Sequence, residues 1–387
     1  MLQAAWRRAP ARLREAIGPR LEFSARRAAL GAPPPPAHAP GPLVVSHYGD
    51  MPFGIGRAGV LTAAALREAG FVVLEHDLRP ALEDRRIDAG ALPASGGVWI
   101  THCNPEHAAA LMSHIARADW ARRYRIGYWA WELPRAPAFW LWLSRFFDEI
   151  WTPSAYAAES LASASAPVRV MPHPVPLAAQ AQGKGGAVRI LAMADLRSAE
   201  ARKNPLGAIE AFKRAFPTPQ AAALLRVKLN GVTFDANALA RLRAAADRPD
   251  IEIIDRVYAE SELDALFAET DLYLSLHRAE GFGLPIAEAM ARGTPALATG
   301  WSGNLQFMAG MDDALVKFSM VPVRDSSGVY RDKHARWAEP DLDDAARKLR
   351  RLVDDETLRA RLGEAARARV SALSESWRKP ALETQPW

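Results

Sequence analysis

Two glutamates enclose a glycine-containing loop in this 387-residue chain. Glu280 precedes the run Gly281-Phe282-Gly283-Leu284-Pro285, and Glu288 follows it three residues later. The glycines permit close backbone approach to a ligand, and the proline fits the first position of a helix. The free N–H groups of such a helix would form a phosphate-binding geometry. The glutamates could then face the two ends of one ligand, or Glu288 could merely complement the helix dipole and Glu280 lie in a surface loop.

The elements that must position this loop alternate between short apolar runs and helical patterns from residue 43 onward. The first series has candidate strands at 43–46, 71–74, 98–101, 126–130, 149–151 and 168–171, with helices at 58–69, 106–118, 138–147 and 155–163. The second series has candidate strands at 188–193, 225–229, 251–254, 272–276, 296–299 and 314–317, with helices at 206–215, 236–246, 261–268, 285–292 and 342–353. This alternation predicts an α/β protein with two doubly wound parallel sheets.

The two series predict domains at 43–180 and 181–365, joined by a Gln-, Gly- and Ala-rich linker around residues 178–186. Ligands of such sheets bind at the carboxyl ends of the strands, so both domains should offer loops to the cleft between them. A helical stretch at 356–373 and the tail at 366–387, with Trp377, could return to the first domain.

Residues 1–42 form a basic arm that ends in a proline-rich linker. The arm has seven arginines against two glutamates, whereas the rest of the chain has equal numbers of basic and acidic residues. The basic character therefore does not indicate that the folded body binds nucleic acid. Leu13, Ile17 and Leu21 recur every four residues, so the arm could be a helix lying on an anionic membrane. The alternative is a partly disordered, solubilising extension.

Composition excludes several classes of protein. Cys103 is the single cysteine, which excludes an intrachain disulfide framework and a four-thiolate zinc site. No run of about 20 apolar residues indicates a transmembrane helix, and arginines continue where a signal peptide would have its apolar core. We therefore expect a cytoplasmic protein, or one attached to the inner face of the membrane. The acidic run Asp341-Leu342-Asp343-Asp344 could hold a metal, but it opens a helical pattern and is typical of a cap.

In this context the Glu280–Glu288 block closely resembles the Glu-x7-Glu motif of the retaining glycosyltransferases of family 4, which have the GT-B fold. Other segments resemble parts of these enzymes more weakly. They are Arg202-Lys203-Asn204-Pro205, Ser302-Gly303-Asn304, Tyr128–Pro134 and Trp151–Ser154. The resemblance covers roughly residues 43–360. It implies two Rossmann-like domains facing a cleft, with metal-independent transfer of a sugar from a nucleotide-diphosphate donor to an acceptor hydroxyl.

The resemblance also implies donor-site roles. Glu280 and Lys203 would be the catalytic pair, with Glu280 beside the transferred sugar. Glu288 would accept hydrogen bonds from the ribose, and the Phe282–Leu284 segment would hold the sugar through backbone amides. Lys203, with Arg202 or Arg197, would neutralise the diphosphate, because the charge that develops on this leaving group needs cations or dipoles in place.

On the acceptor side we expect Gly54, Gly56, His102 and Glu132. The run Gly49–Gly56 would be a glycine-rich loop that closes over the junction of donor and acceptor, and His102 would lie near the sugar. His173, between two prolines, is expected to shape the hinge.

The resemblance implies no cofactor and no metal. The partners would be a nucleotide sugar, with UDP- or GDP-sugars favoured over ADP-sugars, and a glycan or lipid-linked acceptor of bacterial surface polysaccharide synthesis; nucleic acid is not expected. Two alternatives stay open at this stage. One is a two-domain protein that binds a sugar or nucleotide without chemistry, and the other is a degenerate transferase that serves as a partner.

Overall fold

The computed structural model describes residues 23–25, 27–34, 38–49, 51, 54–79, 92–93, 96–180, 186–219, 222–325, 328–330, 332 and 334–378. The amphipathic pattern at residues 13–21 lies outside them, as do residues 181–185 of the linker and residues 379–387 of the tail.

The first sheet is six-stranded and parallel, with the order β2-β1-β3-β4-β5-β6. Its strands are β1 (Leu43–His47), β2 (Val73–Asp77), β3 (Val98–Thr101), β4 (Tyr124–Tyr128), β5 (Glu149–Thr152) and β6 (Val168–Val170). The helices between them are α3 (Gly54–Glu68), α5 (Pro105–His114), α6 (Arg117–Ala121), α7 (Ala138–Leu143) and α8 (Ala155–Ser160). Ser154 caps α8 by accepting a hydrogen bond from the Ala157 N–H.

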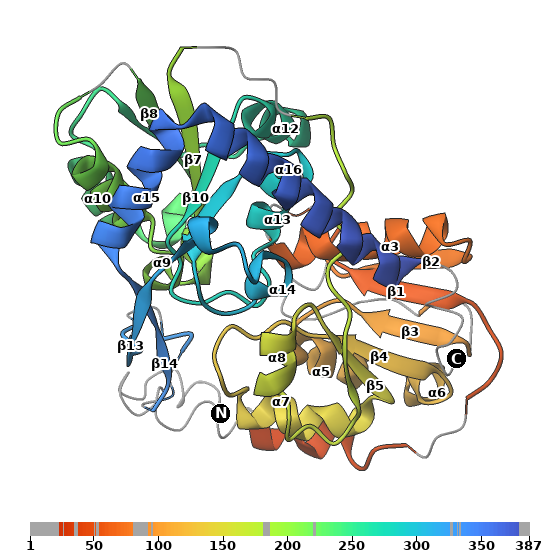
Figure 1. Ribbon diagram of the computed structural model, residues 1–387. Coiled ribbons are helices and arrows are strands. Elements are labelled where there is room, and N and C mark those ends of the chain that lie inside the picture. Colours follow the sequence, from red (N-terminus) through yellow and green to blue (C-terminus); the bar gives the residue numbers. More distant parts are fainter. Residues whose placement is uncertain are drawn as a thin grey trace.

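The second sheet is also six-stranded and parallel, with the order β12-β11-β10-β7-β8-β9. Its strands are β7 (Val188–Asp195), β8 (Ala223–Asn230), β9 (Ile251–Ile254), β10 (Leu272–Ser275), β11 (Ala296–Thr299) and β12 (Leu315–Val316). The helices are α9 (Glu200–Lys203), α10 (Pro205–Ala215), α11 (Ala236–Ala245), α12 (Glu260–Ala268), α13 (Leu284–Ala291), α14 (Leu305–Met308), α15 (Leu342–Asp354) and α16 (Glu356–Leu373). The predicted two-sheet α/β architecture is confirmed (Figure 1).

A two-stranded antiparallel hairpin, missed in the sequence, stands outside both sheets. It consists of β13 (Phe318–Pro322) and β14 (Arg336–Pro340) and lies between β12 and α15. Its residues alternate weakly in polarity, so they carried no clear strand pattern. In Figure 1 the hairpin extends from the second domain beside the first. Asp341 directly follows it and caps α15 by accepting from the Asp343 and Asp344 N–H groups, as predicted.

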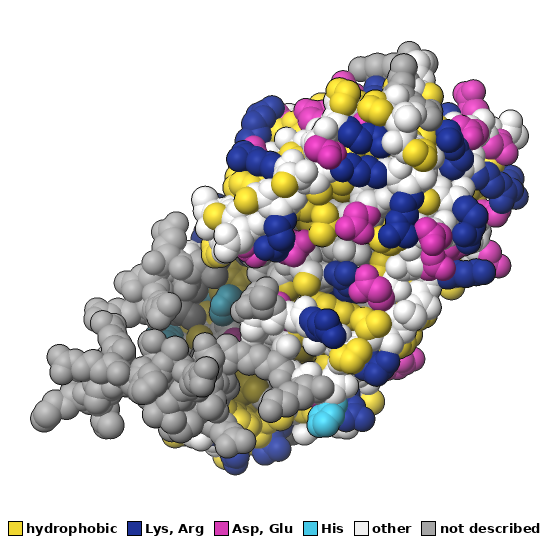
Figure 2. Space-filling view, turned by 90° about the vertical axis from the view of Figure 1, so that its left-hand side faces the viewer, with side chains coloured by type: hydrophobic (Ala, Val, Ile, Leu, Met, Phe, Trp, Pro, Cys, Tyr) yellow, Lys and Arg dark blue, Asp and Glu magenta, His cyan; other side chains and the backbone are white. Residues whose placement is uncertain are grey.

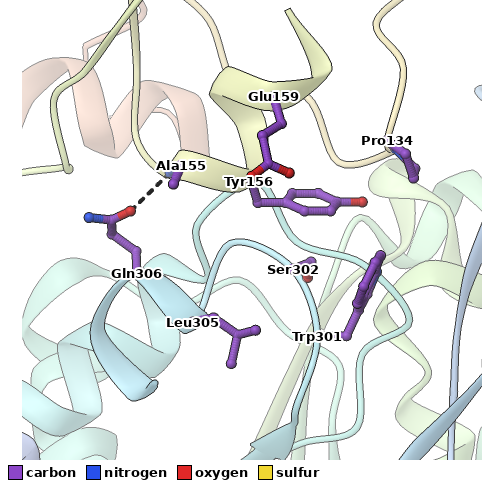
Figure 3. Close-up of a pocket in the computed structure, with 8 residues that line it drawn as sticks. All are labelled: Pro134, Ala155, Tyr156, Glu159, Trp301, Ser302, Leu305 and Gln306. Atoms are coloured by element: carbon purple, nitrogen blue, oxygen red, sulfur yellow. Dashed lines mark hydrogen bonds between the residues drawn. The ribbon is translucent and has the colours of Figure 1, made fainter. Parts of the chain in front are cut away.

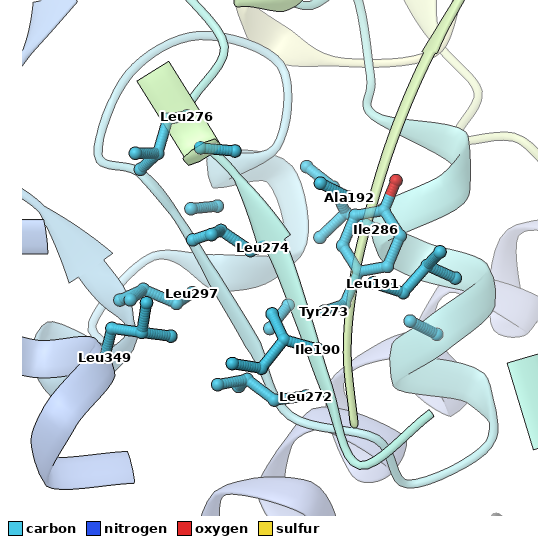
Figure 4. Packing of buried hydrophobic residues seen from close by; sticks show 14 of the residues in the cluster. Ile190, Leu191, Ala192, Leu272, Tyr273, Leu274, Leu276, Ile286, Leu297 and Leu349 are labelled. Atoms are coloured by element: carbon cyan, nitrogen blue, oxygen red, sulfur yellow. The ribbon is translucent and has the colours of Figure 1, made fainter. Parts of the chain in front are cut away.

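Each sheet is covered on both faces, which explains its apolar strands. Figure 4 shows the alternation in the second sheet: Ile190 and Leu272 point to one side of β7 and β10, and Leu191 and Tyr273 point to the other. All four side chains are at most 2% exposed.

The surface is mixed in charge. Basic and acidic side chains are interspersed over the face shown in Figure 2, in agreement with their equal numbers after residue 42. Among the described helices, none combines the length and apolarity that a membrane crossing requires.

The end of the described chain lies on the first sheet. Trp377 is buried against the Trp151 ring, with ring centroids 5.8 Å apart, and its Nε1 donates to the Pro172 carbonyl oxygen at 2.7 Å. Helix α16 thus runs from the second domain to the first (Figure 1).

Candidate active site

The glycine-containing loop connects β10 to α13 and touches the first domain directly. A Cβ atom on Gly281 would lie 3.2 Å from the Ala130 Cβ, so the loop backbone lies against the segment after β4. Gly283 has a φ of 90° and is the N-cap of α13, a conformation that favours glycine. Ser154, at the start of α8, donates to the Gly281 carbonyl oxygen at 2.6 Å. The predicted cleft is therefore narrow at this point, with both domains in contact across the loop.

Glu280 lies at the centre of a buried ionic cluster. Its Oε1 accepts from Lys203 Nζ at 2.5 Å, and its Oε2 accepts from Arg202 Nη1 at 3.0 Å. The Arg202 side chain is 3% exposed and also donates to the Ala279 carbonyl oxygen. Burial alone would raise the pKa of Glu280, but the charges of Lys203, Arg202 and His277 lower it to about 2. Glu280 is thus an anion at neutral pH, held by two cations of its own domain.

Burial also lowers the pKa of Lys203, and the positive charge of Arg202 lowers it further, whereas Glu280 opposes this shift. The three side chains therefore form one interdependent group, in which the carboxylate keeps two neighbouring cations charged.

Glu132 of the first domain completes this cluster. One of its carboxylate oxygens lies 3.7 Å from Arg202 Nη2, and its backbone oxygen accepts from the Tyr156 hydroxyl at 3.1 Å. Tyr330, from the segment between β13 and β14, interacts with both Glu132 and Arg202 and is buried, which raises its pKa. The structure thus brings the predicted residues Glu132, Arg202, Lys203 and Glu280 together.

Arg197 pairs with the carboxylate two residues before it. Its guanidinium binds the Asp195 carboxylate through Nη2 at 2.7 Å and through Nε at 2.9 Å. Of the two arginines considered as companions of Lys203, only Arg202 therefore shares the Glu280 carboxylate with it.

Glu288 lies in α13, and its partner comes from the first domain. Its Oε1 accepts from Arg57 Nε of α3, and the Nη1 of the same guanidinium donates to Glu260 at 3.0 Å. Burial raises the pKa of Glu288, and the charge of Arg57 only partly opposes this. The two motif glutamates therefore do not share a partner: one is paired within its domain, the other across the cleft.

The loop itself presents backbone donors. Among the described residues, the N–H groups of Phe282 and Gly283 have no hydrogen-bond acceptor. The side chains of Phe282 and Leu284 are buried. The Phe282 ring contacts the ring of His173, with centroids 5.0 Å apart, so His173 touches the motif loop.

His102 is deeply buried after β3. Its ring stacks on Tyr128 with centroids 4.2 Å apart, and neither ring nitrogen has a hydrogen-bond partner among the described residues. Burial, together with His173 and His47, lowers the pKa of His102 well below its usual value, so the imidazole is neutral. His102 lies 5.9 Å from the His173 ring, and it is His173 that contacts the loop.

The prediction that Gly54 and Gly56 belong to a loop is wrong. Both lie in the first turn of α3, which begins four residues earlier than predicted. Gly56 is tightly placed there, because a Cβ would lie 3.0 Å from the Met51 carbonyl oxygen. Asp50, Pro52 and Phe53, also in the predicted loop, lie outside the described residues.

Three residues of the site were missed in the sequence. Arg57 follows Gly56 directly, and a cation directly after a glycine-rich segment could have indicated a site residue. His277 is fully buried and lies 3.2 Å from Asn304 Oδ1, where it connects β10 to the loop after β11. Tyr330 had no sequence signal, because its hairpin was not recognised.

The described residues contain no group of three or more His, Cys, Asp or Glu side chains arranged to hold a metal. The site instead offers Lys203, Arg202, Arg57 and the N-terminus of α13, which are groups that stabilise an anion.

Several solved structures share the fold. The Anabaena protein HepE, determined in complex with UDP and glucose, has a TM-score of 0.62 at 12% identity, covering 88% of this chain and 98% of that one. WaaG, a glycosyltransferase involved in lipopolysaccharide biosynthesis, has a TM-score of 0.58 at 15% identity, covering 89% and all of that chain. These similarities show that the two sheets form the GT-B arrangement.

TarM of S. aureus, in a complex with fondaparinux, α-GlcNAc-glycerol and UDP, has a TM-score of 0.53 at 13% identity. The match covers 72% of this chain, which spans only about half of TarM, 54% of its length. A search of curated proteins gave no match.

A protein-family model described as family 4 glycosyltransferase in conflict systems matches residues 154–379. This range is more than half of the chain and contains the second sheet, Glu280 with its partners Lys203 and Arg202, and α16. The chain therefore belongs to the family 4 glycosyltransferases of conflict systems.

Proposed function

We propose that this protein transfers a sugar from a nucleoside diphosphate sugar to an acceptor hydroxyl, with retention of configuration and without a metal ion. The observation that carries the proposal is the buried group of Glu280, Lys203 and Arg202 beside the free N–H groups at the start of α13. Two cations and a helix N-terminus can stabilise a diphosphate leaving group, as a metal does elsewhere.

Each motif residue then has a role in the proposal. Lys203 and Arg202 bind the diphosphate, and the Phe282 and Gly283 N–H groups hold sugar hydroxyls. Glu280, an anion at neutral pH, stabilises positive charge at the reacting carbon. Glu288 accepts hydrogen bonds from the ribose after it releases Arg57. In this mechanism the acceptor attacks the face that the diphosphate leaves, and the departing phosphate accepts the proton.

We favour UDP as the donor nucleotide, because UDP is present in the HepE and TarM structures. The proposed acceptor is a glycan or its lipid-linked precursor, and the proposed location is the cytoplasm or the inner membrane face. The first-domain loops around Glu132 would approach the acceptor.

The test is calorimetric binding of UDP, GDP and ADP, with EDTA present, to the wild type and to Glu288→Ala. Binding of one nucleotide that weakens in the variant supports a metal-free donor site. Detection of the product anomer by NMR then tests retention. Failure of all three nucleotides to bind would favour a protein without transferase chemistry.

A further inference from the structure

A pocket lies between the domains, next to the Glu280 cluster. It has a volume of about 510 Å³. Its lining residues come from the segment after β4, from α8, and from the loop and helix after β11. They are Pro134, Ala155, Tyr156, Glu159, Trp301, Ser302, Leu305 and Gln306.

The pocket has aromatic walls. In Figure 3 the Tyr156 ring lies above it, the Trp301 ring stands at one side and Leu305 at the other, with Ser302 between them. The two rings are nearly perpendicular, with centroids 5.6 Å apart, and Trp301 also packs on Phe318 of the hairpin. Such rings present flat apolar surface with hydrogen-bonding edges, the kind of surface on which the C–H faces of sugar rings stack.

The lining is neutral to acidic. Glu159 is its only charged side chain, and no Lys or Arg is among the residues that line the pocket. A phosphate or diphosphate would therefore find no cation here, in contrast to the Glu280 cluster. The chemistry favours a neutral polyhydroxyl ligand, with Glu159 available to accept hydrogen bonds from hydroxyl groups.

Two hydrogen bonds connect the walls of the pocket to residues of the proposed reaction centre. The Ser302 Oγ accepts from the Glu280 N–H at 2.9 Å, and Ser302 itself has a φ of 81°, which is uncommon for a residue other than glycine. On the opposite wall, the Tyr156 hydroxyl donates to the Glu132 carbonyl oxygen, while the Glu132 carboxylate faces Arg202. Ser302 and Tyr156, which line the pocket, are therefore each one hydrogen bond from a residue of the cluster.

Both domains build the pocket. The Gln306 Oε1 accepts from the Ala155 N–H at 2.9 Å, so α14 is joined to the start of α8 at the edge of the pocket (Figure 3). A ligand held here would contact both domains.

We propose that this pocket binds a neutral sugar unit of the acceptor glycan, at least one unit away from the reacting hydroxyl. The inference rests on the proposed transferase function and specifies its acceptor: a neutral oligosaccharide, not a phosphorylated sugar. Tyr156 and Trp301 supply the stacking surface, and Glu159 supplies the hydrogen-bond acceptor.

The experiment uses the full chain on an array of neutral oligosaccharides and their phosphorylated counterparts, followed by saturation-transfer NMR on those retained. Leu305→Trp fills the pocket, and Ala309→Trp adds the same side chain at an exposed position just beyond α14. Trp301→Ala removes the stacking surface. We expect neutral oligosaccharides to bind the wild type and Ala309→Trp, and to lose at least tenfold in affinity with Leu305→Trp and Trp301→Ala.

UDP binding is measured on the same preparations, so the two proposals fail separately. Unchanged UDP affinity in all variants shows that they are folded and that the donor site is intact. The pocket proposal is overturned if no neutral saccharide binds, if binding is equal in Leu305→Trp and Ala309→Trp, or if phosphorylated sugars bind more tightly than neutral ones. If the wild type does not bind UDP, this result would instead contradict the proposed donor site.

Discussion

Glu280 and Glu288 are eight residues apart, are both buried, and yet have opposite shifts in pKa. Burial raises the pKa of both carboxyls, but two cations outweigh it at Glu280, whereas one cation does not at Glu288. The origin of the partners differs as well. Lys203 and Arg202 belong to the same domain as Glu280, but Arg57 reaches Glu288 from the first domain. Separation of the domains would therefore leave Glu280 paired with Lys203 and Arg202, but would remove Arg57 from Glu288.

This difference indicates that the two glutamates of the motif have different roles. The Glu280 end is preorganised before any ligand arrives, which is what electrostatic stabilisation of a transition state requires. In the proposed function the Glu288 end would exchange Arg57 for the ribose when the nucleotide enters, which would couple nucleotide binding to the position of the first domain.

The largest expected effect follows from Glu280→Gln. The amide leaves Lys203 and Arg202 buried with only the more distant Glu132 carboxylate as counter-charge, so we expect the free energy of unfolding to fall by about 3 kcal/mol. Transfer should be reduced much more than UDP affinity, because the two cations remain available to the diphosphate. Urea unfolding, a transfer assay and calorimetry measure the three quantities.

The matched control is Glu252→Gln, which removes an exposed carboxylate 3.2 Å from Arg226. Its expected cost is below about 1 kcal/mol. Equal stabilities of the two variants would contradict a buried ionic cluster at Glu280.

Glu288→Ala should have the next largest effect. We expect the dissociation constant for UDP to rise about tenfold, the value of one hydrogen bond to a charged group, about 1.5 kcal/mol. Glu260→Ala is the control, because Glu260 binds the same Arg57 guanidinium but is largely exposed. Calorimetry should show a normal UDP affinity for Glu260→Ala. An equal loss of UDP affinity in both variants would contradict the proposal that Glu288 binds the ribose.

Arg57→Ala tests the exchange of partners through pH. Without Arg57 the pKa of Glu288 should rise further, because nothing then opposes burial as strongly. A carboxyl is ionised above its pKa, so the acid-side loss of UDP affinity should begin at a higher pH than in the wild type. At high pH the affinity should equal or exceed that of the wild type, since Arg57 no longer competes.

The measurement is the UDP dissociation constant as a function of pH. Arg67→Ala provides the control on the same helix, where an exposed arginine pairs with Glu75. Superimposable pH profiles for Arg57→Ala and the wild type would show that Arg57 does not influence Glu288.

The smallest expected effect comes from Ser154→Ala. Its hydroxyl caps α8 and reaches across the cleft to Gly281, so the variant should lose about 1 kcal/mol of stability. Transfer should fall moderately while UDP affinity stays unchanged, because only contact between the domains weakens. Thermal unfolding measures the loss of stability, and steady-state kinetics measure transfer and the affinity for UDP. The exposed Ser113→Ala is the reference variant. A weakened affinity for UDP in Ser154→Ala would contradict this prediction.

Most of the architecture was predictable because strands and helices are local. The alternation of apolar runs predicts all twelve strands of the two sheets to within three residues at each end, including the two-residue strand β12. The errors occur where tertiary contacts override local signals. Helix α3 continues through Gly54 and Gly56 despite their low helical propensity, and the β13–β14 hairpin forms from residues with little alternation.

The candidate site was only partly predictable. The glycine loop, Glu280, Lys203 and Glu132 were expected near one another and lie together. The sequence does not distinguish Arg197 from Arg202 as the companion of Lys203, because both arginines have suitable spacing. Packing determines where each guanidinium points: Arg197 binds Asp195, and Arg202 binds Glu280.

Local signals suffice to predict the two parallel sheets and the glycine-containing loop before α13, because periodicity and glycine conformation act over a few neighbouring residues. The charge state of the site instead depends on contacts between residues far apart in the chain. Arg57 and Glu288 are 231 positions apart, and their pairing depends on how the two domains meet. Burial and the number of opposite charges within a few ångströms set each pKa, and both are properties of the packed molecule.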